Sequence, residues 1–121
     1  MSKDSLLMTD DDRARIVATV RLAVGGVPRP TGVVILHGTD TLHATGDRLA
    51  ADLGTPPCPV VLTGAMRPFE MTRSDALQNL TEAIFAAGVL APGVYCVAHG
   101  RAMSFPGVVK DREHGTFVKR S

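Results

Sequence analysis

Three segments of the chain place apolar residues at the spacing of an amphipathic α-helix, and each begins at or just after Ser, Thr or Asp. Residues 9–24 carry aspartates in the first turn and then repeat Ile and Val, until Gly25 stops the pattern. Residues 39–54 place three leucines on one face and end at Gly54, and residues 75–90 follow a serine. We predict three helices, because small polar residues cap helix starts and glycine favours helix ends.

Short apolar runs rich in β-branched residues alternate with these helices. They cover residues 32–36, residues 59–63 and a segment that starts at Gly93. Runs of this kind are typical of strands covered on both faces. The chain after the third run is punctuated by Gly and Pro and is partly basic, and it gives no clear pattern.

The alternating order predicts the fold class. We expect an open, mostly parallel α/β sheet with flanking helices, a flavodoxin-like three-layer arrangement, and right-handed crossovers. The length of 121 residues fits a single domain over residues 1–121. Ligands bind beyond the carboxyl ends of such strands, where residues 37–41, 63–65 and 98–100 fall.

Composition and charge limit the classes of molecule that the chain is expected to bind. The formal net charge of +1, without a long block of like charge, makes nucleic acid an unfavoured partner. No segment reaches membrane-spanning length, and the amino-terminal residues do not resemble a signal peptide. Cys58 and Cys96 lie in or beside apolar runs, so we expect reduced core thiols in a cytoplasmic protein.

Thr39 and Asp40 offer the first candidate chemistry. They leave the first strand at a turn that Gly38 permits, and Lys110 is the candidate base, because a lysine withdrawn from water loses its proton more readily. A threonine hydroxyl is a useful nucleophile only when a base takes its proton. The alternative is that residues 39–41 only cap the following helix, and spacing does not decide between the two.

Other polar residues carry weaker signals. His37, His43, His99 and His114 show no metal-ligand spacing, and no phosphate-binding loop occurs, so we expect neither a metal nor a cofactor. Asp75 and Asn79 lie one helical turn apart, a spacing more typical of helix capping or support than of substrate binding.

Two long motifs resemble the bacterial-type L-asparaginases. "GVVILHGTDTLHAT" is similar to the Gly-Thr-Asp-Thr signature of that family, and "PVVLTGAMRPFEMTRSDALQNLTEAI" is similar to its next block. The similarity extends to "DSLLMTDDD" and "GVVKDREHGTF". It covers nearly the whole chain and implies the amino-terminal, active-site domain of the family, as in its short single-domain members without a carboxyl-terminal domain.

The resemblance implies roles for individual residues. Thr39, Asp40 and Lys110 match the catalytic group, with Asp40 also holding the α-amino group of the substrate. The implied substrate site further includes Ser5, which matches the serine that receives the α-carboxylate, and Gly38 and Ala65 in the two strand-end loops. The neighbour of Ser5, often Gln or Glu in the family, is leucine here.

The sequence departs from the family at its start. Family members begin with a strand and a Thr-Gly-Gly-Thr turn that supplies the primary nucleophile, followed by a mobile loop with a tyrosine. No Thr-Gly-Gly-Thr occurs here, and the only tyrosine, Tyr95, lies in a predicted strand. Without the family's first strand the run at residues 32–36 has an unpaired edge, so we expect either a homo-oligomer that covers it or a translation start further upstream.

The resemblance implies hydrolysis of L-asparagine, with L-glutamine as the other substrate, to the acid and ammonia. Thr39 is then the nucleophile and Lys110 the base. One alternative is a catalytically inactive remnant that binds aspartate or asparagine, or only oligomerises. A nucleotide-binding module of flavodoxin type is disfavoured because it needs a phosphate loop.

Overall fold

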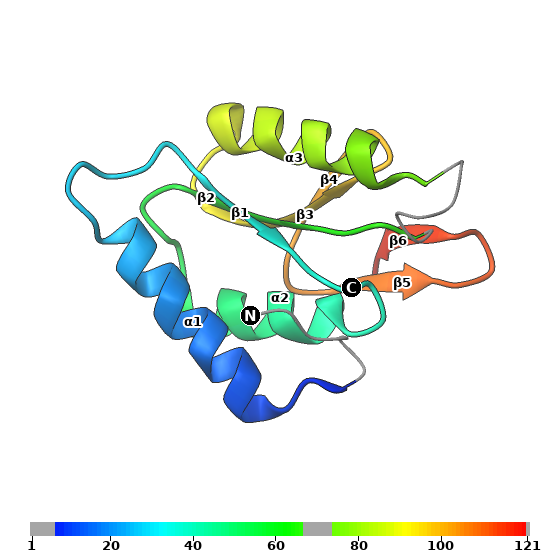
Figure 1. Cartoon of the computed structure of the whole chain (residues 1–121), viewed down its shortest axis with the longest axis horizontal. Coiled ribbons are helices and arrows are strands. Elements are labelled where there is room, and N and C mark those ends of the chain that lie inside the picture. Colours follow the sequence, from blue (N-terminus) through cyan, green and yellow to red (C-terminus); the bar gives the residue numbers. More distant parts are fainter. Residues whose placement is uncertain (1–6, 67–73, 121) are drawn as a thin grey trace.

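The computed structural model describes residues 7–66 and 74–120. Helices and strands alternate through most of the chain and end in short strands (Figure 1). The elements are α1 (Asp10–Val24), β1 (Val33–Leu36), α2 (Leu42–Leu53), β2 (Pro59–Thr63), α3 (Ala76–Val89), β3 (Gly93–Ala98), β4 (Arg101–Ser104), β5 (Val108–Asp111) and β6 (Thr116–Lys119).

The main sheet has four strands in the order β1-β2-β3-β4. β1, β2 and β3 are parallel, and β4 pairs antiparallel with β3. α1 and α2 lie on one face of this sheet and α3 lies on the other (Figure 1). The mostly parallel, three-layer α/β fold predicted from the sequence is therefore confirmed.

The two crossovers between the parallel strands have opposite hands. Both advance in the same direction, from β1 to β2 and from β2 to β3. Leu49 of α2 shares a core cluster with Leu62 of β2, whereas Ala83 of α3 shares the opposite cluster with Val61. Both crossovers step across the sheet in the same direction, but their helices lie on opposite faces, so one of the two crossovers must be left-handed. The expectation of right-handed crossovers throughout is therefore wrong, and this exception to the common rule has no local sequence signal.

This topology sends the segments after β1 and β2 toward opposite faces of the sheet. α2 starts at Leu42 on one face and α3 starts at Ala76 on the other. Neighbouring parallel strands whose following segments diverge in this way mark the usual ligand-binding position of open α/β sheets. Residues 38–40 and 64–65 follow these two strands.

The helix ends match most of the sequence signals. Thr9 caps α1 in a capping box with Asp12, and Gly25 and Gly54 end the first two helices. Asp75, rather than Ser74, occupies the N-cap position of α3, although the Ser74 hydroxyl accepts from the Ala76 amide at 3.2 Å.

β2 and β1 differ in burial. All five residues of β2 are buried, whereas β1 is only half-buried and Leu36 is 65% exposed. In the part of the chain that the structure describes, β2 is the only strand paired with β1. Val33 and Ile35 pack against one core cluster and Val34 packs against the other, so the first apolar run is covered on both faces as expected, although less completely than β2.

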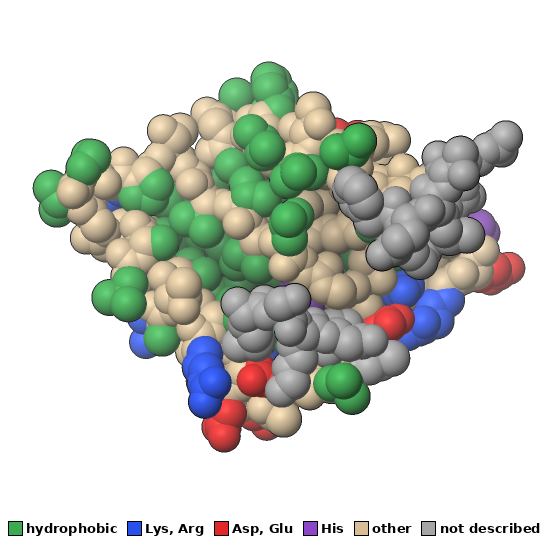
Figure 2. All heavy atoms as spheres, in the orientation of Figure 1, with side chains coloured by type: hydrophobic (Ala, Val, Ile, Leu, Met, Phe, Trp, Pro, Cys, Tyr) green, Lys and Arg blue, Asp and Glu red, His purple; other side chains and the backbone are tan. Residues whose placement is uncertain are grey.

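A groove of about 580 Å³ lies between α1 and β1. Ile16 and Val20 of α1 and Val34 and Leu36 of β1 contribute apolar walls, and Arg15 contributes a charge. Figure 2 shows apolar side chains gathered over this region and on the outer surface of α3. The predicted unpaired edge thus coincides with a hollow, apolar surface.

The last third of the chain folds in a way that the sequence analysis did not predict. β4 adds an antiparallel edge to the sheet, and β5 and β6 form a separate hairpin with Lys110 paired to Phe117. Each of these strands has four residues, which is too short to show a clear period. Phe117 and Val108 nevertheless belong to the main core cluster, so the hairpin is packed against the domain.

Cys58 and Cys96 are both free and buried, as predicted. Burial raises the pKa of the Cys96 thiol to about 12. Among the described residues, no helix combines the length and apolar character that a membrane span requires.

Candidate active site

Lys110 contacts the other two residues that the sequence predicted to be catalytic, Thr39 and Asp40. Its Nζ donates to Thr39 Oγ1 at 2.8 Å and to Asp40 Oδ1 at 2.9 Å. Thr39 is buried, and the side chains of Lys110 and Asp40 are 16% and 26% exposed. A hydroxyl, a carboxylate and an amine therefore meet at the end of β1, although Lys110 comes from a hairpin about seventy residues later.

Arg112 is a fourth member that the sequence analysis missed. Its Nη2 lies 2.8 Å from Asp40 Oδ1, the same oxygen that accepts from Lys110. The hydrogen bond from Lys110 is the main cause that holds the pKa of Asp40 below its usual value, and Arg112 adds to the effect. We call Thr39, Asp40, Lys110 and Arg112 the Lys110 cluster.

The helix-capping alternative receives no support from the start of α2. Thr41 occupies the N-cap position, and its side chain makes no capping hydrogen bond. The hydroxyl of Thr39 and the carboxylate of Asp40 contact Lys110 instead. These contacts are of the kind that the catalytic interpretation requires.

Gly64 allows the loops after β1 and β2 to approach each other closely. A β-carbon at this position would lie 2.2 Å from the His37 carbonyl oxygen and 3.1 Å from Thr39 Cγ2. Any larger residue would therefore push the two loops apart. Gly38 and Ala65, the other predicted substrate-site positions, lie in these two loops, whereas Ser5 is outside the described residues.

His37, at the end of β1, joins the site to both helices on its face of the sheet. Its Nδ1 donates to the Gly38 carbonyl at 2.7 Å, and its Nε2 lies 2.8 Å from the hydroxyl of buried Thr45 on α2. Arg13 of α1 donates to the same hydroxyl at 3.3 Å. Burial, which disfavours the charged imidazole, is the main cause that lowers the pKa of His37. The neutral ring fits these contacts.

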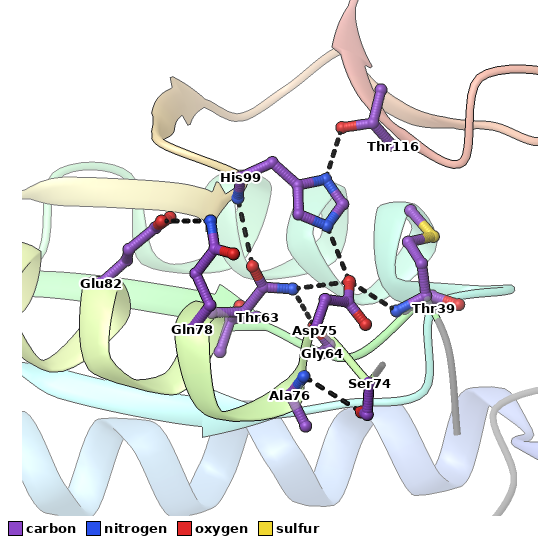
Figure 3. Close-up of polar contacts among 12 residues, drawn as sticks. Thr39, Thr63, Gly64, Ser74, Asp75, Ala76, Gln78, Glu82, His99 and Thr116 are labelled. Atoms are coloured by element: carbon purple, nitrogen blue, oxygen red, sulfur yellow. Dashed lines mark hydrogen bonds and ion pairs between the residues drawn. The ribbon is translucent and has the colours of Figure 1, made fainter. Parts of the chain in front are cut away.

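A second polar cluster lies at the ends of β2 and β3 (Figure 3). His99 Nε2 donates to Asp75 Oδ2 at 2.7 Å, and His99 Nδ1 lies 2.8 Å from the Thr116 hydroxyl. Asn79, 1% exposed, donates to the Gly64 carbonyl at 2.7 Å and accepts from the His99 amide at 3.1 Å. We call Asp75, Asn79, His99 and Thr116 the His99 network.

The His99 network joins α3 to the strand ends and to the hairpin. Asp75 Oδ2 also accepts from the Met66 amide and from Asn79 Nδ2, each at 3.0 Å, and the Asp75 side chain makes no capping bond to α3. Asp75 and Asn79 thus support the loops after β2 and β3 rather than cap the helix. Their spacing in the sequence could not reveal His99 and Thr116 as partners.

No group of three or more His, Cys, Asp and Glu side chains among the described residues is placed to hold a metal ion. The chemistry that the described site offers comes from a hydroxyl, an amine, a carboxylate and a guanidinium.

Known proteins are similar to this chain in sequence and in fold. The sequence model of the asparaginase amino-terminal domain matches residues 1–116. L-asparaginase of Thermococcus kodakarensis is 48% identical over 64 residues, which cover 53% of this chain and 20% of that protein. A glutamyl-tRNA(Gln) amidotransferase component of Methanococcus maripaludis strain C5 is 42% identical over 69 residues, which cover 57% of this chain and 16% of that protein.

The solved structure of the thermostable L-asparaginase from Thermococcus kodakarensis superimposes with a TM-score of 0.88 and 35% identity. The match covers 98% of this chain but 36% of that one, so the chain spans about a third of the solved protein. These matches confirm the resemblance seen in the motifs. The chain belongs to the family of the asparaginase amino-terminal domain.

Proposed function

We propose that the Lys110 cluster hydrolyses the side-chain amide of L-asparagine to L-aspartate and ammonia. The observation that carries the proposal is the pair of bonds from Lys110 Nζ to Thr39 Oγ1 and Asp40 Oδ1. These bonds join a hydroxyl, an amine and a carboxylate in one place, which supports the roles of nucleophile, base and ammonium-binding group for Thr39, Lys110 and Asp40. Family membership supports amide hydrolysis as the class of reaction.

In the proposed reaction Thr39 is the nucleophile. With Lys110 in its neutral form, Nζ takes the hydroxyl proton while Oγ1 forms a bond to the amide carbon. The tetrahedral intermediate collapses as the carbon–nitrogen bond breaks, and the Lys110 ammonium returns the proton to the departing amide nitrogen, which leaves as ammonia. Water then hydrolyses the ester, which releases aspartate and restores the threonine.

The remaining groups bind and orient the substrate. Asp40 receives the α-ammonium group, and this contact weakens the attraction of the carboxylate for the Lys110 ammonium. We assign the backbone amides of the loop at Gly64 and Ala65, which approaches Thr39 closely, as the donors to the developing oxyanion. Such donors stabilise the charge of the intermediate more strongly than that of the ground state.

The test is ammonia release from L-asparagine and from L-glutamine by the purified 121-residue chain. We expect turnover of L-asparagine that Thr39→Val abolishes. If the chain binds L-aspartate but releases no ammonia, hydrolysis by this chain is contradicted and the inactive, ligand-binding alternative is supported.

We further propose that the chain self-associates, because β1 lies at the edge of the described sheet beside an apolar groove. An uncovered apolar strand edge favours pairing with another chain. Sedimentation velocity between 1 and 100 µM, about the range in which weak contacts form, should show a dimer or larger species. A stable, folded monomer throughout this range would contradict the proposal.

A further inference from the structure

Three buried polar side chains lie behind the loop that carries Thr39. Thr45 of α2 is fully buried, His37 at the end of β1 is 6% exposed, and the side chain of Arg13 on α1 is 12% exposed. Hydrogen bonds join Arg13 Nε to Thr45 Oγ1 at 3.3 Å and Thr45 Oγ1 to His37 Nε2 at 2.8 Å. The series ends where His37 Nδ1 lies 2.7 Å from the Gly38 carbonyl. We call Arg13, Thr45 and His37 the His37 bridge.

The groups at the two ends fix the direction of every hydrogen bond in the His37 bridge. A carbonyl can only accept, so the proton of the neutral His37 ring must lie on Nδ1. The other ring nitrogen, Nε2, then has a lone pair and accepts from the Thr45 hydroxyl. The oxygen of that hydroxyl can still accept from Arg13 Nε, which can only donate. Only one of the two tautomers of the neutral imidazole therefore satisfies all three bonds.

The last bond of the bridge acts on the peptide group that precedes the proposed nucleophile. The Gly38 carbonyl and the Thr39 amide belong to one planar unit, so a fixed carbonyl also fixes the direction in which the backbone enters Thr39. The loop after β2 approaches from the other side, since a β-carbon on Gly64 would lie 3.1 Å from Thr39 Cγ2. Contacts on two sides thus orient Thr39, whose hydroxyl meets Lys110 Nζ at 2.8 Å.

We infer that Thr45 and Arg13 are positioning residues for Thr39, and that they act through the Nδ1–H tautomer of His37. This inference rests on the proposed function, in which Thr39 attacks the substrate amide. A nucleophile must be held close to its productive position, because a displacement of about 1 Å can lower the rate about a hundredfold. Loss of the Thr45 hydroxyl leaves the buried Nε2 without a donor, so the ring turns or changes tautomer and releases the Gly38 carbonyl.

The tautomer can be tested without any substrate. Nitrogen NMR of the imidazole rings distinguishes Nδ1–H from Nε2–H, and the spectrum of His37→Gln identifies the signals of this ring. At a pH of about 7.5, where an ordinary histidine is neutral, we expect a single Nδ1–H tautomer in the wild type and in Thr45→Ser. We expect a mixture of tautomers in Thr45→Val. A wild-type ring in the Nε2–H form would overturn the inference whatever the activity, because the Gly38 carbonyl would then lack its donor.

Turnover of L-asparagine tests the effect of the Thr45 hydroxyl on the reaction. Valine keeps the shape of threonine without the hydroxyl, so Thr45→Val should lower kcat about tenfold or more and change KM by less than about twofold. Thr45→Ser keeps the hydroxyl and should retain most of the wild-type kcat. Melting temperatures of both variants would show that they are folded.

Two arginines of α1 provide a matched comparison. Arg13→Met removes the start of the His37 bridge and should lower kcat by a smaller factor than Thr45→Val, because the Thr45 hydroxyl can still donate to His37. Arg21 also joins α1 to α2, through a bond of 2.9 Å from its Nη2 to the Asp52 carbonyl, but it lies outside the bridge. Arg21→Met should therefore change neither kcat nor KM.

The other outcomes overturn the inference in distinguishable ways. If Thr45→Val raises KM alone, the bridge serves substrate binding rather than Thr39, and if both constants stay unchanged the bridge is only structural. If Arg13→Met and Arg21→Met lower kcat equally, the two bonds only hold α1 against α2. If the wild type shows the Nδ1–H tautomer but releases no ammonia, the proposed function itself fails, and the positioning role fails with it.

Discussion

The Lys110 cluster and the His99 network hold the β5–β6 hairpin from opposite faces. Lys110 pairs with Phe117 and Asp111 pairs with Thr116, and consecutive residues of a strand point to opposite sides. Lys110 therefore reaches Thr39 and Asp40 from one face, and Thr116 meets His99 on the other. One short hairpin thus joins two polar clusters that differ in their construction.

The two clusters differ in how completely the hydrogen-bonding capacity of their polar groups is satisfied within the protein. In the His99 network the Asn79 amide bonds through both its oxygen and its nitrogen, and Asp75 Oδ2 contacts three partners. The Lys110 cluster instead places two cations on one oxygen and leaves Arg112 largely in solvent. Saturated buried networks fix a structure, whereas open charged clusters can exchange partners with a ligand. We therefore assign stability to the first and chemistry to the second.

Asn79→Ala should give the largest loss of stability. It leaves the His99 amide and the Gly64 carbonyl, which are partly buried, without their partner, and an unsatisfied group costs about 1–3 kcal/mol when burial is complete. We expect the free energy of unfolding in urea to fall by about 2–4 kcal/mol, the sum of two such groups after partial relaxation. Gln78→Ala, on the exposed side of the same helix, should change it by less than about 0.5 kcal/mol. A loss for Asn79→Ala as small as that of Gln78→Ala would remove the distinction between the clusters.

A smaller loss of stability should follow from protonation of His37, which supports the loop that carries Thr39. The free energy of unfolding should therefore depend on pH. Its pKa in the folded state is lowered by burial, so the unfolded chain binds a proton first as the pH falls. The contribution of neutral His37 to the free energy of unfolding is complete above the pKa of histidine in the unfolded chain, about 6.5. Below that pH the contribution decreases by at most about 1.4 kcal/mol per pH unit. Urea midpoints at pH 7.5 and 5.5 should therefore differ.

His37→Gln should reduce this difference between the two midpoints, because glutamine does not titrate. His43→Gln serves as the control histidine on α2 and should leave the contribution of His37 in place. Equal pH dependence in the wild type and His37→Gln would show that His37 is not the titrating group.

Much of the fold could be predicted because its signals are local. The capping box at Thr9 and the glycines at positions 25 and 54 mark helix ends, and the runs at β2 and β3 mark buried strands. The hand of the crossovers and the burial of β1 depend on how elements pack, so no short segment encodes them. The short strands β4, β5 and β6 likewise form through partners distant in the sequence.

The residues of the candidate site likewise divide into those with a local sequence signal and those that only tertiary contacts reveal. Thr39 and Asp40 were found because they follow a clear strand, and Lys110 was found as a candidate base that the family resemblance then matched to the catalytic group. Arg112 lies two residues beyond Lys110, and its contact with Asp40 appears only when the hairpin is folded. His99 was placed at a strand end where ligands bind and was considered as a metal ligand, but its partners Asp75 and Thr116 lie 24 and 17 residues away and could not be inferred.

The central claim is that the contacts of Lys110 serve chemistry rather than folding, and substitution of two lysines in one hairpin tests it most directly. Lys110→Met removes the proposed base, whereas Lys119→Met removes a lysine that donates to the carbonyls of Ser104 and Pro106. Ammonia release from L-asparagine and the melting temperature would be measured on both variants and the wild type. We predict that Lys110→Met loses one to two powers of ten or more in turnover, about 1.4 to 2.8 kcal/mol of transition-state stabilisation, while it stays folded. Lys119→Met should retain turnover. Unchanged turnover in Lys110→Met beside an active wild type would contradict the account.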